Sequence, residues 1–210
     1  MDEKALLSEA KAFMEGADPA HDFSHVLRVL ALAKAICKKE NADMEILIPA
    51  AILHDIGRQD KSSLEKRRLS ADESALMASE ILKKHGFPER KIGKILYSIT
   101  VHGFSKGVTP ETLEAKILQD ADRLDAIGAI GMARCFAVGG QLKRQLHHAE
   151  DPLAKNREPD DGLYSVDHFY RKLMLLKSGM HTGTGRRLAE RRHKFLETFL
   201  EQLETDIKGR

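Results

Sequence analysis

Apolar residues recur at helical spacing along most of this chain, and this periodicity constrains its fold more than any other feature. One apolar stripe with three- and four-residue spacing runs over residues 26–36, and a second runs over residues 46–53. No stretch of four or more residues alternates convincingly between apolar and polar side chains, so no strand is predicted. We therefore predict an all-α fold, a single-domain helical bundle.

Local signals predict where several helices begin. Ser70-Ala71-Asp72-Glu73 fits a capping box, in which a hydroxyl caps the helix and Glu follows three residues later. Thr109-Pro110-Glu111 predicts an N-cap followed by proline in the first turn of a helix that reaches Ile127. Thr184-Gly185-Arg186 predicts the start of a last long helix that ends near Ile207.

Glycine, proline and polar residues predict the breaks between helices. These breaks are expected at residues 16–19, 59–61, 86–88, 103–107 and 139–140. Residues 147–165 form the least regular segment, and we interpret it as a long surface loop rather than an interdomain linker. The helices that follow it are too few to build a core of their own, so residues 1–210 are predicted to form one domain.

Composition narrows the classes of protein. Hydrophobic residues make up 42% of the 210 residues and charged residues 31%, which excludes a disordered chain. No apolar run is long enough for a membrane span. Lys and Arg number 34 against 32 for Asp and Glu, a net charge of +2, which argues against a dedicated nucleic-acid binder. Only residues 186–194 concentrate basic side chains, so we expect no nucleic-acid partner and no membrane partner.

Two cysteines are too few for a disulfide framework. Cys37 and Cys135 are therefore expected to be buried thiols of a protein from a reducing compartment. The first residues, Met1-Asp2-Glu3-Lys4, lack the apolar segment of a secretory signal. We expect a cytoplasmic protein.

Histidine and carboxylate side chains gather in three places where helices are predicted. His21 and His25 lie four residues apart at the head of one helix, so both rings project from one face. His54-Asp55 ends the most apolar helix of the chain. Asp120-Ala121-Asp122-Arg123-Leu124-Asp125 places three carboxylates inside another apolar helix. At about 100° per residue, Asp122 and Asp125 lie about 60° apart, whereas Asp120 lies about 160° from Asp122 and is expected to point elsewhere.

Burial decides what these groups can do. Burying ionised carboxylates is costly unless a positive charge neutralises them, and a divalent cation does this directly. The alternative is that each histidine is a hydrogen-bonded structural residue and each carboxylate lies on a solvated helix face. From the residues alone, both interpretations stay open.

The spacing of these groups resembles the H…HD…D signature of the HD-domain metal-dependent phosphohydrolases. The signature residues are His25, His54-Asp55 and Asp122, and the longer stretches Leu53-His54-Asp55-Ile56-Gly57-Arg58 and Gln119-Asp120-Ala121-Asp122-Arg123-Leu124-Asp125 also resemble the family. The resemblance covers a core at about residues 21–132 of an HD-type helical bundle. It extends to a helical tail at residues 166–207, which is similar to a bacterial branch of nucleotide pyrophosphohydrolase-like members.

The resemblance implies that His25, His54, Asp55 and Asp122 bind one divalent metal ion. Two imidazoles and two carboxylates suit Mn²⁺, which we expect first, and also Fe²⁺, Co²⁺, Ni²⁺, Zn²⁺ or Mg²⁺. In several relatives a further histidine stands where this chain has Ser70, and such histidines help to bind a second metal ion. With Ser70 in that place, we expect a single ion.

Further residues near the signature are candidates for catalysis and substrate binding. Arg58 and Arg28 are the expected cations for phosphate oxygens. Asp125 is expected to orient the attacking water or to anchor a sugar hydroxyl. His102 follows the predicted helix 92–101 and is either a substrate-facing catalytic imidazole or a helix C-terminal histidine favoured by the dipole. His21 is either a phosphate contact or a structural residue.

Residues and resemblance together imply a metal-dependent phosphohydrolase acting on a small phosphorylated metabolite, with a nucleotide as the expected substrate. We expect a nucleoside triphosphate to be split into monophosphate and pyrophosphate, and the alternative is a nucleoside monophosphate phosphatase. A non-catalytic module that binds a nucleotide and holds the metal structurally is a second class of function. The intact set of four ligands, together with Arg58 and Asp125, argues against that class. The oligomeric state is left open.

Overall fold

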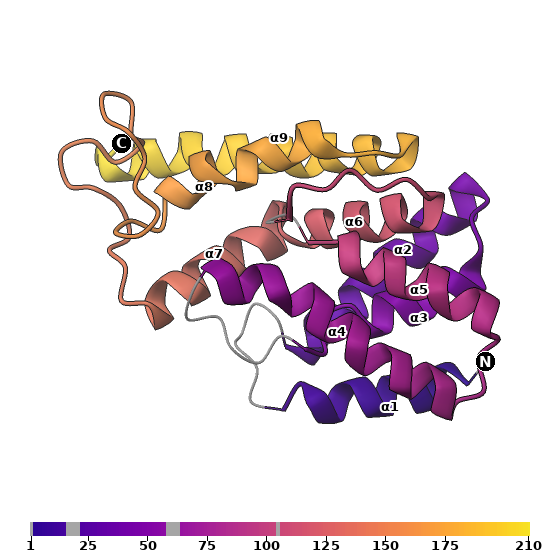
Figure 1. The fold of residues 1–210 in the computed structure, drawn as a ribbon. Coiled ribbons are helices and arrows are strands. Elements are labelled where there is room, and N and C mark those ends of the chain that lie inside the picture. The colour runs from indigo at the N-terminus through magenta and orange to yellow at the C-terminus, as the bar shows by residue number, and fades with distance from the viewer. Residues whose placement is uncertain (1, 16–21, 58–63, 104–105) are drawn as a thin grey trace. The chain divides into compact units, whose positions relative to one another are not determined.

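The computed structural model describes residues 2–15, 22–57, 64–103 and 106–210, with residues 64–69 described by their backbone alone (Figure 1). In these residues the regular structure is helical, and the strand-like pairing is limited to one isolated bridge between Gln145 and Tyr164. The predicted all-α fold is confirmed. By its contacts the chain divides into two compact units, Met1–Asp122 with His181–Gly185 and Arg123–Met180 with Arg186–Arg210. The predicted bounds of core and tail stay predictions.

The first unit is built around one apolar helix. It contains α1 (Glu3–Phe13), α2 (Phe23–Glu40), α3 (Met44–Leu53), α4 (Leu64–Lys84), α5 (Glu89–Val101) and most of α6 (Leu113–Asp125). Helix α3 contacts α1, α2, α4 and α5, and its residues from Ile46 to Leu53 are buried except Ile48, which is partly exposed. Because the chain leaves α3 inside the unit, the next two residues, His54 and Asp55, are buried as well.

Short polar side chains fix the ends of α2 and α3. The Asp22 carboxylate accepts a hydrogen bond from the backbone N–H of His25 at 3.0 Å and caps α2. Asn41, in the left-handed conformation with φ 56°, ends the same helix. Asp43 caps α3 by accepting from the N–H of Glu45 at 2.8 Å. The Asp22 cap thus fixes the turn that carries His25.

Two predicted helix starts are wrong. Helix α4 begins at Leu64, so Ser70-Ala71-Asp72-Glu73 lies inside a helix and does not cap it. Residues 64–69 are good helix formers without glycine or proline, so the helix continues through the capping pattern. Helix α6 begins at Leu113, and its cap is Thr112, whose hydroxyl accepts from the N–H of Ala115 at 3.3 Å. Thr109 precedes a proline, which disfavours helical backbone, and the helix ends at Asp125.

The second unit contains the end of α6, α7 (Gly128–Gln141), α8 (Asp167–Arg171), the 3-10 helix η2 (Leu173–Gly179) and nearly all of α9 (Gly183–Ile207). Phe136, Phe169 and Phe199 pack together with ring centroids 5.6 to 5.9 Å apart. Helix α9 ends at Ile207 as predicted and begins one residue before Thr184.

Some predicted breaks are confirmed and one is wrong. Residues 86–88 separate α4 from α5, and the described residues of the second break, 103, 106 and 107, lie between α5 and α6, as expected. The expected breaks at 16–19 and 59–61 lie outside the described residues. Helix α7 continues through residues 139–140 to Gln141. Gly139 serves close packing, because a Cβ there would lie 2.1 Å from the Ser165 hydroxyl oxygen.

The predicted long loop at residues 147–165 is irregular but held by a buried carboxylate. Asp167 is fully buried and accepts from Nη2 of Arg157 at 2.8 Å and from the N–H of Asp160 at 2.6 Å. The Arg157 guanidinium also lies over the ring of Tyr164, 4.9 Å from its centroid. These contacts tie the loop to the start of α8.

Candidate metal centre

Four segments of the first unit bring histidine and carboxylate side chains together. His25 lies in the first turn of α2, His54 and Asp55 follow α3, His102 follows α5, and Asp122 lies in the last turn of α6. The first four residues are buried, and the side chain of Asp122 is 24% exposed. We call these five residues the His/Asp cluster.

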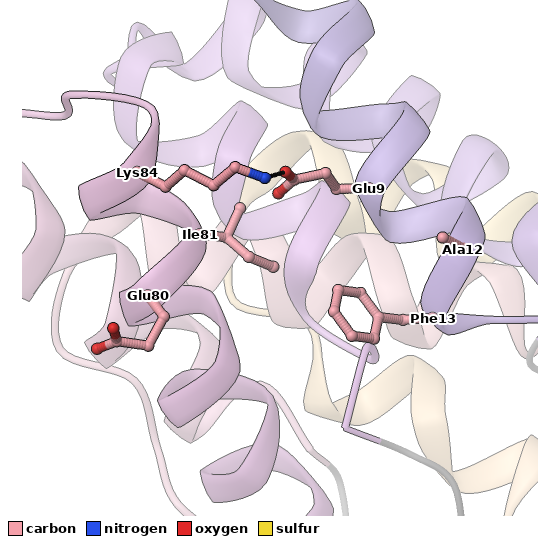
Figure 2. A pocket seen from close by; sticks show the side chains of 6 residues that line it. All are labelled: Glu9, Ala12, Phe13, Glu80, Ile81 and Lys84. Carbon is pink, nitrogen blue, oxygen red and sulfur yellow. Dashed lines mark hydrogen bonds and ion pairs between the residues drawn. The ribbon is translucent and has the colours of Figure 1, made fainter.

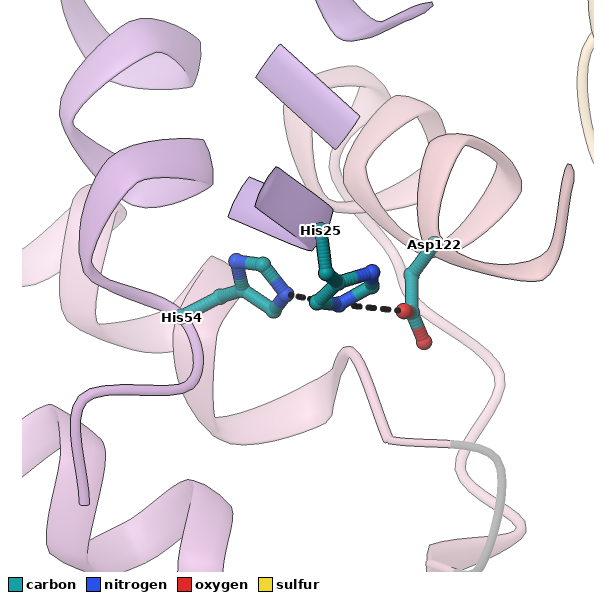
Figure 3. Close-up of side chains that lie close together, drawn as sticks. All are labelled: His25, His54 and Asp122. Atoms are coloured by element: carbon teal, nitrogen blue, oxygen red, sulfur yellow. Dashed lines mark hydrogen bonds and ion pairs between the residues drawn. The ribbon is translucent and has the colours of Figure 1, made fainter. Parts of the chain in front are cut away.

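The donor atoms of the His/Asp cluster lie close to one another. Figure 3 shows His25 between His54 and Asp122, with Nε2 of His25 3.2 Å from Nε2 of His54 and 3.5 Å from Oδ1 of Asp122. Asp55 adds its Oδ2, which lies 3.7 Å from Nε2 of His25 and 4.0 Å from Nε2 of His54. The other oxygen of Asp55, Oδ1, faces Nε2 of His102 at 3.5 Å.

Backbone carbonyls determine which ring nitrogens carry protons. Nδ1 of His54 lies 2.8 Å from the carbonyl oxygen of Ala51, and Nδ1 of His102 lies 2.6 Å from that of Ile99. A carbonyl oxygen only accepts, so Nδ1 is the donor in both rings. The neutral ring of His54 therefore carries its lone pair on Nε2, the atom that faces His25. Metal-ligating histidines commonly hold their second ring nitrogen in this way.

Burial and neighbouring charges set the ionisation of the cluster. Burial lowers the pKa of His54 to about 4, so this ring is neutral at pH 7. Burial raises the pKa of the Asp122 carboxyl, but the neighbouring histidines, His25 first, outweigh it and hold that pKa below its usual range. Burial lowers the pKa of His102, but the hydrogen bond and the charge of Asp55 outweigh it, so that pKa lies above its usual value. The cluster thus combines a neutral imidazole with an ionised carboxylate.

This donor set fits a divalent first-row metal ion. Ligands about 2.1 Å from one ion lie roughly 3.0 to 3.4 Å apart at right-angled or tetrahedral positions. The two shortest separations in the cluster, 3.2 Å and 3.5 Å, are close to this range. His25, His54 and Asp122 form one group whose ligand atoms could share an ion, and His54, Asp55 and His102 form another.

A separate hollow of the first unit lies between α1 and α4 (Figure 2). It has a volume of about 340 Å³ and an apolar floor that includes Phe13 and Ile81, and Glu9 pairs with Lys84 beside it. None of its lining residues belongs to the His/Asp cluster. The candidate centre is therefore identified by its converging donor atoms and not by this hollow.

Comparison with known proteins places the chain in a family. The profile of the HD domain matches residues 22–127, about half of the chain and the stretch that carries all five residues of the His/Asp cluster. The chain belongs to the HD domain family. In the part of the chain that the structure describes, no helix is long and apolar enough to cross a membrane.

Two relatives of this HD chain resemble it over nearly its full length. The uncharacterized protein YpgQ of Bacillus subtilis is 37% identical over 193 residues, which cover 90% of this chain and 85% of YpgQ. The crystal structure of YpgQ in complex with ADP superimposes with a TM-score of 0.74 at 33% identity and covers 97% of this chain and 94% of that one. An HD-superfamily hydrolase from Bacillus thuringiensis gives a TM-score of 0.77 at 29% identity, covering 99% and 97% of the two chains.

The structure brings the four predicted ligands of this HD chain together, and their assignment to a metal stays a prediction. His102, expected to face substrate or to end a helix, lies after α5 with its ring against Asp55. Arg28 lies in α2, where its Nη1 donates to the Ser24 hydroxyl at 2.7 Å. Arg58 and His21 lie outside the described residues.

Asp125 and Asp120 have partners outside the His/Asp cluster. Asp125 belongs to the second unit, where it is buried and pairs with Arg134 at 2.6 Å. Asp120 is buried and accepts from the N–H of His181 at 2.8 Å and from the N–H and hydroxyl of Thr182 at 2.9 Å and 2.7 Å. Helix geometry separates Asp120 from Asp122 as predicted, but no sequence signal links Asp120 to donors 61 and 62 residues downstream.

Proposed function

We propose that this chain is a metal-dependent phosphohydrolase that splits a nucleoside triphosphate into the monophosphate and pyrophosphate. The observation that carries the proposal is that two imidazoles and two carboxylates from three helical segments lie around Nε2 of the buried His25. Membership of the HD domain family supports hydrolysis of a phosphate bond. Nucleoside monophosphates are alternative substrates, and a hydrolysis screen distinguishes them from triphosphates.

His25, His54, Asp55 and Asp122 would hold one divalent ion, with Mn²⁺ expected first. When bound, such an ion polarises a phosphoryl group and makes hydroxide available near neutral pH. The neutral Nε2 of His54 and the ionised carboxylate of Asp122 are in the protonation states that ligands require. The tautomer of His54 is already fixed by Ala51, so this ligand is preorganised.

Arginine side chains would bind the phosphate oxygens. Arg58 follows the ligand pair His54-Asp55 by three residues, and its planar guanidinium can grip two oxygens at once. Arg28 is oriented by its hydrogen bond to the Ser24 hydroxyl. That hydroxyl in turn donates to the Asp22 carboxylate at 2.6 Å, and the same carboxylate caps α2. This connection couples the orientation of Arg28 to the turn that carries His25. His21 is a further candidate for a phosphate contact.

His102 and Asp125 are the proposed acid–base and orienting groups. In the reaction the water oxygen bonds to the α-phosphorus, the bond from that phosphorus to the bridging oxygen breaks, and pyrophosphate leaves. The water proton passes to solvent, and the ring of His102, which carries protons on both nitrogens when charged, can donate one to the leaving pyrophosphate. Asp125 is proposed to orient the attacking water or to anchor a sugar hydroxyl. The support for a nucleotide substrate is that the similar protein YpgQ has been crystallised with ADP.

A hydrolysis screen with a matched control tests this proposal. The purified protein is incubated with Mn²⁺ and nucleoside tri-, di- and monophosphates, and pyrophosphate and phosphate release are measured separately. We expect pyrophosphate from a triphosphate, no release by Asp122→Ala, and unchanged release by Asp206→Ala, which removes an exposed carboxylate of α9. Phosphate from a monophosphate would favour the phosphatase. Binding of ADP without any release would favour the non-catalytic module, which the ADP complex of YpgQ also fits.

A further inference from the structure

Gln119 is a buried amide that uses all of its hydrogen-bonding groups. It lies in α6, three residues before Asp122, with 1% of its surface exposed. Its Nε2 donates to the carbonyl oxygens of Val101 at 2.9 Å and Val108 at 3.2 Å, and its Oε1 accepts from Nε2 of His181. Since carbonyl oxygens only accept, the orientation of the amide is fixed by its partners.

The two carbonyls that Gln119 binds flank the segment after α5. Val101 is the last residue of α5, where a carbonyl has no partner within its own helix. Val108 lies seven residues further along the chain. One amide nitrogen therefore satisfies the end of α5 and also holds Val101 close to Val108.

The Val101 carbonyl belongs to the peptide bond that leads into His102. Holding this carbonyl fixes the peptide plane from which the His102 side chain departs. The ring is then fixed by its Nδ1, which donates to Ile99, and this leaves Nε2 facing Oδ1 of Asp55 at 3.5 Å. A continuous set of contacts thus runs from Gln119 through His102 to Asp55.

The far side of Gln119 is held as well. His181, which donates to Oε1, is itself fixed by its backbone N–H, which donates to Asp120 at 2.8 Å. Gln119 and Asp120 are neighbours on α6, but only Gln119 contacts the carbonyls beside His102.

We propose that Gln119 is a positioning residue of the metal centre, which fixes the Val101–His102 peptide so that His102 holds the Asp55 carboxylate in place. The inference rests on the proposed function, because it takes Asp55 as a metal ligand. It assigns a role to a residue that acts through His102 and need not touch the ion. Groups that orient a ligand in this way commonly change metal affinity by about tenfold or more.

A double-mutant cycle on Mn²⁺ affinity tests the proposal. The dissociation constant for Mn²⁺ alone is measured by calorimetry for the full-length wild type, Gln119→Met, His102→Ala and the double variant. We expect each single variant to weaken binding about tenfold, and the double variant to match His102→Ala within about twofold, because Gln119 acts through His102. The control is Arg157→Met, which removes the guanidinium partner of the buried Asp167 carboxylate in the second unit and should lower the melting temperature without changing Mn²⁺ affinity.

Several outcomes would overturn the proposal. Wild-type affinity in Gln119→Met, or effects that multiply to about a hundredfold in the double variant, would show that Gln119 does not act through His102. Weakened binding in Arg157→Met would show that general loss of stability lowers affinity. If Gln119→Met does not fold, Gln119→Glu, which can still accept from His181 but opposes a carboxylate to two carbonyls, is measured with the same expectation. A failure of both variants to fold would make Gln119 a folding residue and overturn the assignment.

The double-mutant cycle and the hydrolysis screen can fail independently, so a wrong reaction can be told from a wrong positioning role. The cycle needs Mn²⁺ binding only, so it is decided even if no nucleotide is hydrolysed. If wild type hydrolyses no nucleotide but binds Mn²⁺ with the expected cycle, the proposed reaction is wrong and the positioning role stands. If wild type binds no Mn²⁺, the metal centre and the positioning role are both wrong.

Discussion

The backbone N–H of Gly57 donates to the Ser74 hydroxyl at 3.0 Å, and the two residues approach so closely that only glycine fits. A Cβ on Gly57 would lie 2.5 Å from the backbone nitrogen of Ser74 and 2.8 Å from the backbone carbon of Glu73. Backbone atoms cannot turn aside as a flexible side chain can. The chain that has just supplied His54 and Asp55 is therefore held directly against α4.

We expect Gly57→Ala to be strongly destabilising. The added methyl must displace the backbone of α4 or of the ligand segment, and overpacking of this kind costs about 1–3 kcal/mol or more. Because Asp55 is two residues away, Mn²⁺ affinity should fall as well. The matched variant Ser74→Ala loses the hydrogen bond without a clash and should cost about 1 kcal/mol. Equal unfolding free energies for the two variants, measured in urea, would contradict the close-approach explanation.

Asp122→Ala and Asp120→Ala should have opposite effects. Asp122→Ala removes a proposed ligand, so Mn²⁺ content and turnover should be lost together. Asp120→Ala leaves two backbone N–H groups and one hydroxyl without their acceptor in the interior, which should cost about 3 kcal/mol while Mn²⁺ content is retained. Metal analysis and urea unfolding of both proteins decide this. Loss of metal in Asp120→Ala with retention in Asp122→Ala would show that the ligand register is wrong.

Asp125→Ala should keep the metal but lose rate. If Asp125 orients water or substrate, turnover should fall about a hundredfold. Its buried ion pair with Arg134 will also be lost, at about 3 kcal/mol. Arg134→Met breaks the same pair from the other side and is the control for that stability cost. Turnover that falls equally in both variants, at a temperature where both are folded, would mean that Asp125 is only structural.

Removal of the metal should destabilise the fold, because the proposed ligands converge only in the native state. At a hundredfold excess of Mn²⁺ over its dissociation constant, binding adds about 2.7 kcal/mol. For a chain of this size, this corresponds to a melting temperature roughly 5–10 °C higher than in chelator. Asp122→Ala should show no such shift. An unchanged wild-type melting temperature after verified metal removal would contradict a converging metal site.

Both thiols should be unreactive in the native protein. Burial raises the pKa of the Cys135 thiol to about 12, and its Sγ donates to the carbonyl oxygen of Ser165 at 3.3 Å. Burial also raises the pKa of Cys37. The reactive thiolate of Cys135 is therefore populated only as the pH approaches 12, far above the ordinary pKa of a cysteine thiol. A disulfide reagent at about pH 8 should modify neither cysteine until the protein is unfolded in guanidinium, and one rapidly modified thiol in the native protein would contradict this.

The sequence predicts most helices because their signals are local. The apolar stripes at 26–36 and 46–53 fall within α2 and α3, and the last helix ends where expected. The errors occur where a local pattern has two interpretations. A serine followed three residues later by glutamate starts some helices but also occurs inside them, as at Ser70. Two threonines precede α6, and only the structure shows that Thr112 is the one that caps it.

The candidate site was partly predictable from the family resemblance and not from local helix signals. The family resemblance groups His25, His54, Asp55 and Asp122, and the structure does bring them together. The family resemblance does not reveal that Gln119 binds the carbonyls of Val101 and Val108, because these contacts depend on how α5 and α6 pack. Long-range hydrogen bonds to backbone leave no recurring spacing in a single sequence.

The short segment His181–Gly185 belongs to the first compact unit, although the residues on both sides of it belong to the second. The polypeptide thus passes from one unit to the other three times. A fragment that stopped after the family-matched stretch, at residue 127, would leave the Asp120 carboxylate buried without the donors of His181 and Thr182. Excising the matched stretch, swapping it between relatives or grafting it onto another protein would therefore remove part of its own interior. A fragment that keeps the interior of the first unit therefore needs His181–Gly185 as well as Met1–Asp122.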